Sequence, residues 1–141
     1  MHENQSSPCN CLNLRRASQA ITDMYDNRLT LSGLTISQYS LLRYINRLGP
    51  VSVSDLAIEI RLDRTTLVRN LKPLEEKGLI HDASKKGARN RQLLLSESGK
   101  NTFEYATALW QEAQKEIEQA LGKENLQTLT SLLSKIEALE L

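Results

Sequence analysis

The sequence has little of several residue types, and each shortage excludes a class of protein. Its 141 residues include two cysteines, three prolines, one phenylalanine and one tryptophan, and the net charge is only +1. Two cysteines cannot supply the disulfide framework on which small secreted domains depend. No apolar run approaches the roughly 18–20 residues that cross a bilayer, and the N-terminus has no signal-peptide pattern. We therefore expect a cytoplasmic protein that does not enter a membrane.

Catalytic and metal-binding motifs are also missing. The chain has no glycine-rich phosphate loop and no H-E-x-x-H sequence, and its two histidines, His2 and His81, are far apart along the chain. A Cys-x-Cys pair together with these histidines offers too few suitably spaced ligands for a metal ion. The sequence therefore predicts neither an enzyme nor a bound metal or cofactor.

The charges that are present are unevenly distributed. Residues 61–91 contain nine basic and four acidic residues, whereas residues 97–141 contain four basic and eight acidic residues. This asymmetry indicates a basic region directed toward a polyanion and an acidic body directed away from it. With 40% hydrophobic residues, the chain has the length and composition of one domain spanning residues 1–141.

Hydrophobic spacing and capping motifs predict a mainly helical protein. After a flexible tail over residues 1–10, apolar positions recur every three or four residues from 11 to 29. Thr35 and Gln38 fit a capping box, and Gly49 is expected to end that helix in the left-handed conformation. Four further helices are expected to follow capping or small residues, namely Ser52, Asp63, Ser96 and Gly122.

The segment LDRTTLVRNLKPLEEKGLI, residues 62–80, contains the second helix of a predicted helix-turn-helix. Leu67, Leu71 and Leu74 are spaced to face the core. The opposite face then carries basic and hydroxyl side chains that suit the bases and phosphates of a DNA duplex: Arg64, Thr65, Thr66, Arg69 and Lys72. Placing three of them in the first turn fits a helix that enters the major groove N-terminus first.

Two segments with strand character, residues 79–83 and 91–95, flank the loop SKKGARN. They predict a small β-hairpin, the wing of a winged helix. Its basic residues can reach phosphates or the minor groove: Lys85, Lys86, Arg89 and Arg91.

Together, SVSDLAIEIRLDRTTLVRNLKPLEEKGLI, the basic wing and LLLSESG resemble the MarR family of bacterial winged-helix transcription regulators. The resemblance covers nearly the whole chain. It implies a winged helix-turn-helix lobe over residues 34–95, dimerisation helices over 11–33 and 96–141, and a homodimeric repressor that binds a pseudo-palindromic operator in double-stranded DNA. The family's wing usually carries D-x-R; here Arg89 is the arginine, and Gly87 replaces the aspartate that would steady it.

An apolar heptad pattern suggests how two copies would associate. It comprises Phe103, Ala106, Trp110, Ala113, Ile117 and Ala120. The family resemblance makes this seam, with the first helix, the dimer interface; an intrachain helical hairpin is the alternative. A winged helix that binds a partner protein instead of DNA is the alternative function.

The resemblance extends in part to a branch that senses organic hydroperoxides through a cysteine hydrogen-bonded by tyrosines. Cys11, Tyr25 and Tyr39 match that pattern, and Arg15 stands where the branch has another tyrosine. A nearby cation and the helix N-terminus favour a reactive thiolate. Once Cys11 is oxidised, Cys9, a neighbouring subunit or a small cellular thiol would resolve it. Two alternatives stay open: a small phenolic effector, or no effector, with Cys11 a small buried residue.

Overall fold

The computed structural model describes residues 5–85, 87 and 89–139. Over these residues the chain forms a 3₁₀ turn, η1 (Thr30–Ser32), and the α-helices α1 (Asn10–Leu29), α2 (Ile36–Leu48), α3 (Val53–Ile60), α4 (Arg64–Glu76), α5 (Glu97–Leu121) and α6 (Lys123–Glu137). The expected mainly helical class with a hairpin wing is confirmed. None of the described helices has the length and apolarity that crossing a membrane requires.

The strands form one small antiparallel sheet in the order β1-β3-β2, with bounds β1 (Val51–Ser52), β2 (Ile80–Asp82) and β3 (Gln92–Leu95). β2 and β3 are the two arms of the expected hairpin, and Ile80 pairs with Leu95. β1 was not expected from the sequence. It is two residues long and exists because Val51 and Ser52 pair with Leu93 and Gln92 across the sheet.

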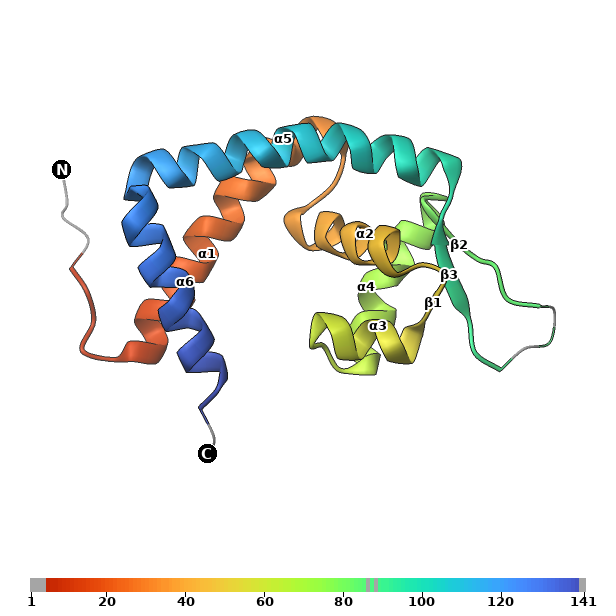
Figure 1. Cartoon of the computed structure of the whole chain (residues 1–141), viewed down its shortest axis with the longest axis horizontal. Helices are drawn as coiled ribbons and strands as arrows, with labels where there is room; N and C mark the ends of the chain where they lie inside the picture. Colours follow the sequence, from red (N-terminus) through yellow and green to blue (C-terminus); the bar gives the residue numbers. More distant parts are fainter. Residues whose placement is uncertain (1–4, 86, 88, 140–141) are drawn as a thin grey trace.

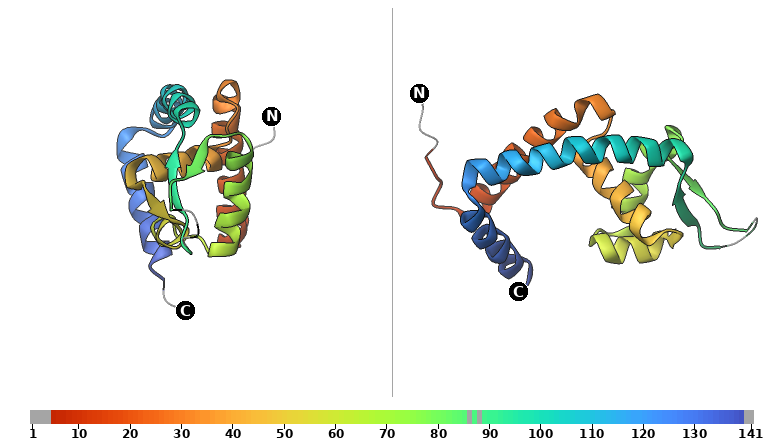
Figure 2. Two further views of the ribbon diagram at one scale, coloured as in Figure 1. Left: turned by 90° about the vertical axis from the view of Figure 1, so that its right-hand side faces the viewer. Right: turned by 45° about the horizontal axis from the view of Figure 1, so that its top comes forward.

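The long helix α5 joins two groups of elements (Figure 1). α2, α3, α4 and the sheet lie below its N-terminal half, and we call this group the winged lobe. α1 and α6 extend from the other side of the molecule, and α1 packs along α5. Figure 2 shows the wing, the loop between β2 and β3, standing clear of the helices.

The core of the winged lobe follows from the hydrophobic spacing. Leu67, Leu71 and Leu74 are buried, as their positions on one face of α4 predicted. Tyr39 of α2 is also buried, and its ring stacks on Phe103 and Trp110 of α5, with centroid separations of 5.4 and 5.7 Å. The aromatic stack therefore fixes the lobe to α5.

The capping predictions are confirmed at the start of α2. The Thr35 hydroxyl accepts the Gln38 N–H at 3.2 Å, and the Gln38 side chain accepts the Thr35 N–H at 3.0 Å. Ser52 and Ser96 cap α3 and α5 through single side-chain hydrogen bonds. Each bond satisfies a backbone donor that the first helical turn leaves without a partner.

The expected left-handed cap at Gly49 is wrong. Gly49 ends α2 in an extended conformation, with φ −64° and ψ 148°. A Cβ at this position would lie 2.6 Å from the Ile45 carbonyl oxygen and 3.2 Å from that of Leu93. Glycine is favoured here because a Cβ would collide with the last turn of α2 itself and would also crowd β3, and not because of a positive φ.

Four of the six residues of the heptad seam are used inside one chain. Ala106 and Ala113 are fully buried, and Phe103 and Trp110 pack against the core of the winged lobe. The intrachain alternative therefore accounts for these four residues. Apolar side chains remain exposed elsewhere, on α1, the end of α5 and α6, at Leu12, Leu14, Ile21, Leu121, Leu129, Leu132, Leu133 and Ile136.

Of the expected flexible tail, residues 1–10, the structure describes residues 5–10, and Asn10 already belongs to α1. Residues 1–4 lie outside the described part of the chain. Ser7 is held against the first turns of α1, because its N–H donates to the Asn13 side chain at 2.8 Å and its carbonyl accepts from the Asn13 amide at 2.7 Å.

Candidate nucleic-acid interface

The start of α4 is set by Asp63. Its carboxylate accepts the Thr66 N–H at 2.8 Å and the Thr66 hydroxyl at 2.7 Å. Hydrogen bonds from the Thr66 backbone and side chain, assisted by the positive charge of Arg69, lower the pKa of Asp63. Thr66 was expected among the DNA contacts, but its hydroxyl proton is already committed to this cap. The helix N-terminus nevertheless keeps its partial positive charge exposed.

The outer face of α4 is basic and accessible. The exposed basic and hydroxyl side chains of α4 are Arg64, Thr65, Arg69 and Lys72. Thr65, Arg69 and Lys72 lie opposite the buried leucines, whereas Arg64 lies at the start of the helix on the side nearer α3. Val68, an apolar residue that the helical spacing also places on the outward face, is 45% exposed. Arginine, threonine and valine side chains on one such face supply the hydrogen-bonding and methyl contacts by which base edges are read.

Arg64 is oriented by the neighbouring helix. Its Nη1 donates to the Ser54 hydroxyl of α3 at 3.3 Å. Sequence reasoning missed Ser54, because nothing in the spacing of the helix-turn-helix shows which α3 side chain lies beside the start of α4. The contact directs the guanidinium group along the surface that the two helices share.

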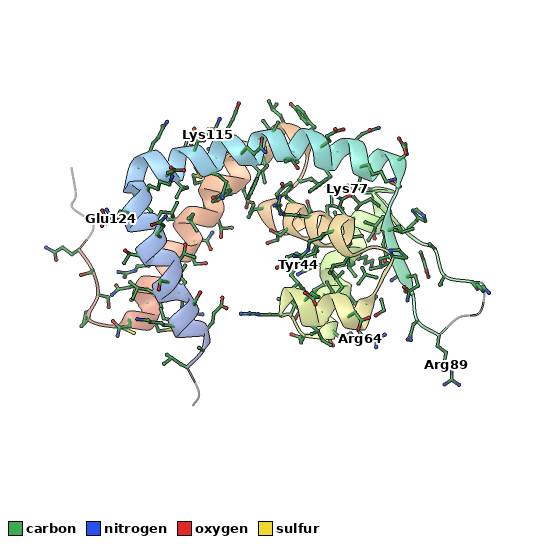
Figure 3. All side chains as sticks on the ribbon, in the orientation of Figure 1. Tyr44, Arg64, Lys77, Arg89, Lys115 and Glu124 are labelled. Carbon is green, nitrogen blue, oxygen red and sulfur yellow. The ribbon has the colours of Figure 1, made fainter. Side chains whose placement is uncertain are left out.

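The wing carries Arg89 away from the body of the molecule. Gly87 has φ +87°, so this loop position needs a residue without a Cβ. Lys85 and Arg89 are exposed. Lys86, which was also expected to bind DNA, lies outside the described residues. Figure 3 shows Arg64 and Arg89 on the same side of the winged lobe, the side opposite α5.

Arg91 is placed differently from the expectation. It is partly buried at the base of the wing, where its Nη2 binds Glu75 of α4 and its Nε lies 3.8 Å from Asp82 of β2. Its charge is therefore compensated inside the lobe. Glu75 and Asp82 were not predicted as site residues, because Glu75 is 16 positions from Arg91 and only the fold brings them together.

The cysteine–tyrosine group is not assembled within one chain. Cys9 and Cys11 lie at the start of α1 and are exposed in the single chain, so Cys11 is not buried within one copy. Tyr25 lies on the same helix fourteen residues later, about 21 Å along its axis. Its hydroxyl binds Gln114 of α5, and burial raises the pKa of this phenol.

Tyr39 and Arg15 are likewise separate from the thiols. The Tyr39 hydroxyl lies 3.1 Å from the Thr107 hydroxyl and accepts from Arg43 at 3.4 Å. Arg15 is exposed, one turn along α1 from Cys11. Within one chain, the hydroxyl groups of Tyr25 and Tyr39 therefore bind α5 and not the Cys11 thiol.

No cluster of three or more histidine, cysteine or carboxylate side chains suits a metal ion within residues 5–85, 87 and 89–139. His81 is exposed on β2. His2 falls outside this range.

Comparison with known proteins defines the class of this fold and site. The MarR family model matches residues 34–86, which include α2, α3, α4 and β2. The DNA-bound structure of the transcriptional regulator MosR from Mycobacterium tuberculosis is 32% identical. The match covers 94% of this chain and 99% of that one, with a TM-score of 0.78. The chain belongs to the MarR family of transcription regulators, a family of non-enzymatic proteins.

More distant structures share the fold. The Staphylococcus aureus MepR–DNA complex is 21% identical, and the match covers 94% of this chain and 98% of that one, with a TM-score of 0.80. A mutant of Escherichia coli MarR complexed with operator DNA is 22% identical, with coverages of 87% and 89% and a TM-score of 0.78. The winged helix-turn-helix fold inferred from the sequence is therefore confirmed.

Proposed function

We propose that the protein is a homodimeric repressor that binds a pseudo-palindromic operator in double-stranded DNA. The observation that carries the proposal is the exposed basic face of α4, which lies with Arg89 on one side of the winged lobe. Arg64, Thr65 and Arg69 contact bases or adjacent phosphates in the major groove, Lys72 and Lys85 neutralise phosphates, and Arg89 enters the minor groove. Lys86 is proposed as a further phosphate contact on sequence grounds.

The dimer is formed by residues 11–33 and 96–141, with residues 34–95 as the DNA-binding lobe. One feature supports this division. Apolar side chains on α1 and α6 are exposed in the single chain, in two helices on the other side of the molecule from the winged lobe. A palindromic site requires the two α4 helices of such a dimer to lie about one DNA turn apart.

Oxidation of Cys11 is the proposed switch. The exposed thiolate attacks an organic hydroperoxide, the O–O bond breaks, the alcohol leaves, and the sulfur becomes sulfenic acid. A second thiol, from Cys9, another subunit or a small cellular thiol, then condenses with it and releases water. Arg15, exposed one helical turn from Cys11, is the proposed cationic neighbour of the reacting sulfur. Tyr25 and Tyr39 of a second copy are the proposed hydrogen-bonding partners.

A small aromatic effector is the second candidate switch, and a specific feature favours it. A groove of about 460 Å³ lies between α2 and α5, beside the aromatic stack, lined by Asn46, Phe103, Thr107 and Gln111 among others. A ring bound there would contact the joint between the winged lobe and α5.

Selection from a genomic fragment library tests the function and its switch together. The reduced protein should enrich a palindrome, and treatment with an organic hydroperoxide should abolish this enrichment. Cys11→Ser should retain binding after treatment, whereas Cys9→Ser, the matched control two residues away, should still form sulfenic acid at Cys11. Enrichment that ignores the oxidant would contradict the thiol switch and favour the small effector. No enrichment in either state would contradict DNA binding and favour the protein-interaction module.

A further inference from the structure

The wing is a long loop fastened only at its base. Among the described residues, the last backbone hydrogen bond between its arms runs from the Ala83 N–H to the Gln92 carbonyl at 2.7 Å. Arg89, the proposed minor-groove contact, lies farther along the loop than this hydrogen bond. The direction of the wing therefore depends on what holds residues 82, 91 and 92.

Asp82 fastens both arms of the hairpin. Its Oδ1 accepts the Ser84 N–H at 2.9 Å, on its own arm, and the Gln92 N–H at 2.9 Å, on the other arm. One carboxylate thus joins the end of β2 to the start of β3. This replaces the backbone pairing that the hairpin loses where the loop opens.

Arg91 then ties the fastened base to α4. Its guanidinium group binds Glu75 in the last turn of α4 and lies near Asp82 on β2. The three side chains are 33–39% exposed, so they are shielded from solvent more than an ordinary surface ion pair. A guanidinium group between two carboxylates in such a setting constrains geometry better than an isolated pair does.

We infer that Arg91, Glu75 and Asp82 form an anchor that sets the direction of the wing relative to α4 and thereby positions Arg89 for the minor groove. The role of Arg89 in the minor groove rests on the proposed function, whereas the anchor itself rests on the contacts described above. Arg91 is then a positioning residue and not a phosphate contact. In this chain the anchor restrains the wing at its base. The aspartate that the family usually has at position 87 would instead restrain Arg89 near the tip of the wing.

Hydrogen exchange in the protein without DNA tests the anchor by itself. Arg91→Gln and Glu75→Gln should each speed the exchange of the Ala83 and Gln92 amides by about two- to fivefold, the size expected for losing a partly exposed ion pair. Because both replacements break the contact between Arg91 and Glu75, the double variant should show little more than Arg91→Gln alone, which also loses the contact with Asp82. Glu76→Gln, on the exposed neighbouring position of α4, is the matched control and should leave exchange unchanged. Unchanged exchange in both single variants would overturn the anchor.

Operator binding shows whether Arg91 positions the wing or contacts DNA directly. The two roles of Arg91 predict opposite effects of Glu75→Gln on operator affinity. Removing a negative charge near DNA strengthens binding if electrostatics alone matters. If the anchor positions Arg89, Glu75→Gln should instead weaken binding about two- to fivefold, as Arg91→Gln does. Both variants should keep the salt dependence of the wild-type protein, whereas Arg89→Ala should lower its slope by about one phosphate contact.

Stronger binding by Glu75→Gln, or a reduced salt slope in Arg91→Gln, would make Arg91 a direct phosphate contact and overturn the inference. Thermal unfolding of each variant shows whether the lobe is still folded. If the wild-type protein binds no DNA, the proposed function fails, and hydrogen exchange alone then decides whether the anchor exists.

Discussion

Single residues on the winged lobe show that a basic or hydroxyl side chain is not automatically available to DNA. The Thr66 hydroxyl is bound to Asp63, and the Arg91 guanidinium group is bound to Glu75. Both were expected to contact DNA because the sequence gives their chemistry and their face of the helix or hairpin. Their partners depend on rotamers and on the packing of the hairpin against α4, which spacing along the chain does not reveal.

Gly99 allows a close approach between α5 and Leu79 that the sequence alone does not indicate. A Cβ there would lie 1.9 Å from the Leu79 carbonyl oxygen, which is held in place by the Ser96 N–H at 3.0 Å. We expect Gly99→Ala to lower the free energy of unfolding by about 1–3 kcal/mol, because α5 must move away from the hairpin. Chemical denaturation measures this. Ser98→Ala, at the exposed neighbouring position, should change stability little; equal stability of Gly99→Ala would contradict the close approach.

Asp82 offers a test by pH. Hydrogen bonds from the Ser84 side chain and from the Gln92 and Ser84 N–H groups lower the pKa of Asp82 from 3.8 to about 2. The stabilisation from its carboxylate is therefore complete above about pH 4 and lost as the pH falls through 2. A carboxyl NMR titration should find Asp82 about one-tenth protonated at pH 3. Ser84→Ala should raise the midpoint toward 3.8, and a wild-type midpoint near 3.8 would contradict these hydrogen bonds.

At the scale of the elements, caps and hydrophobic spacing were sufficient to predict most of the fold. Thr35, Asp63 and Ser96 each begin a helix as expected, since a cap acts within four residues. β1 was not predictable in this way, because it depends on β3, about forty residues further along the chain, and no local pattern signals a two-residue strand. The extended conformation of Gly49 has a local cause, since Pro50 follows it and the residue before a proline favours extended backbone.

The outer face of α4 was predictable because three leucines define the opposite face. We expect Arg69→Ala to relax the preference at one operator base position by about 1–3 kcal/mol, since a lost bidentate contact removes discrimination against the wrong base. Lys72→Ala, the control on the same helix, should weaken binding about equally for all sequences. Competition assays with singly substituted operators measure both. An unchanged base preference in Arg69→Ala would exclude it as a base-reading residue.

At the scale of the whole molecule, the chain presents more apolar surface on α1 and α6 than a single copy uses. Leu132 and Leu133 are 49% and 41% exposed on α6, and Leu14 is 39% exposed on α1. Contiguous exposure of this kind marks a protein interface. The heptad seam predicted that this face of α5 packs against other elements. It did not predict whether those elements belong to the same chain, because a sequence pattern carries no such information.

We therefore expect Leu133→Asp to convert a dimer into a folded monomer that binds the operator far more weakly. Light scattering gives the mass, and circular dichroism gives the helix content. Ile58→Asp is the matched control, because Ile58 is 73% exposed on α3, in the winged lobe and outside the proposed interface. It should remain dimeric. A monomeric wild-type protein, or a dimer that survives both replacements, would contradict the proposed interface.

The salt dependence of operator binding tests the central claim most directly. Two winged lobes that together neutralise about eight phosphates release the condensed counterions of those phosphates. The account predicts that affinity falls on the order of 10³-fold or more between 50 and 200 mM salt, with a smaller loss in Arg89→Ala. Affinity for the enriched fragment that scarcely changes over this range would contradict a DNA-binding role for the basic face of α4 and the wing.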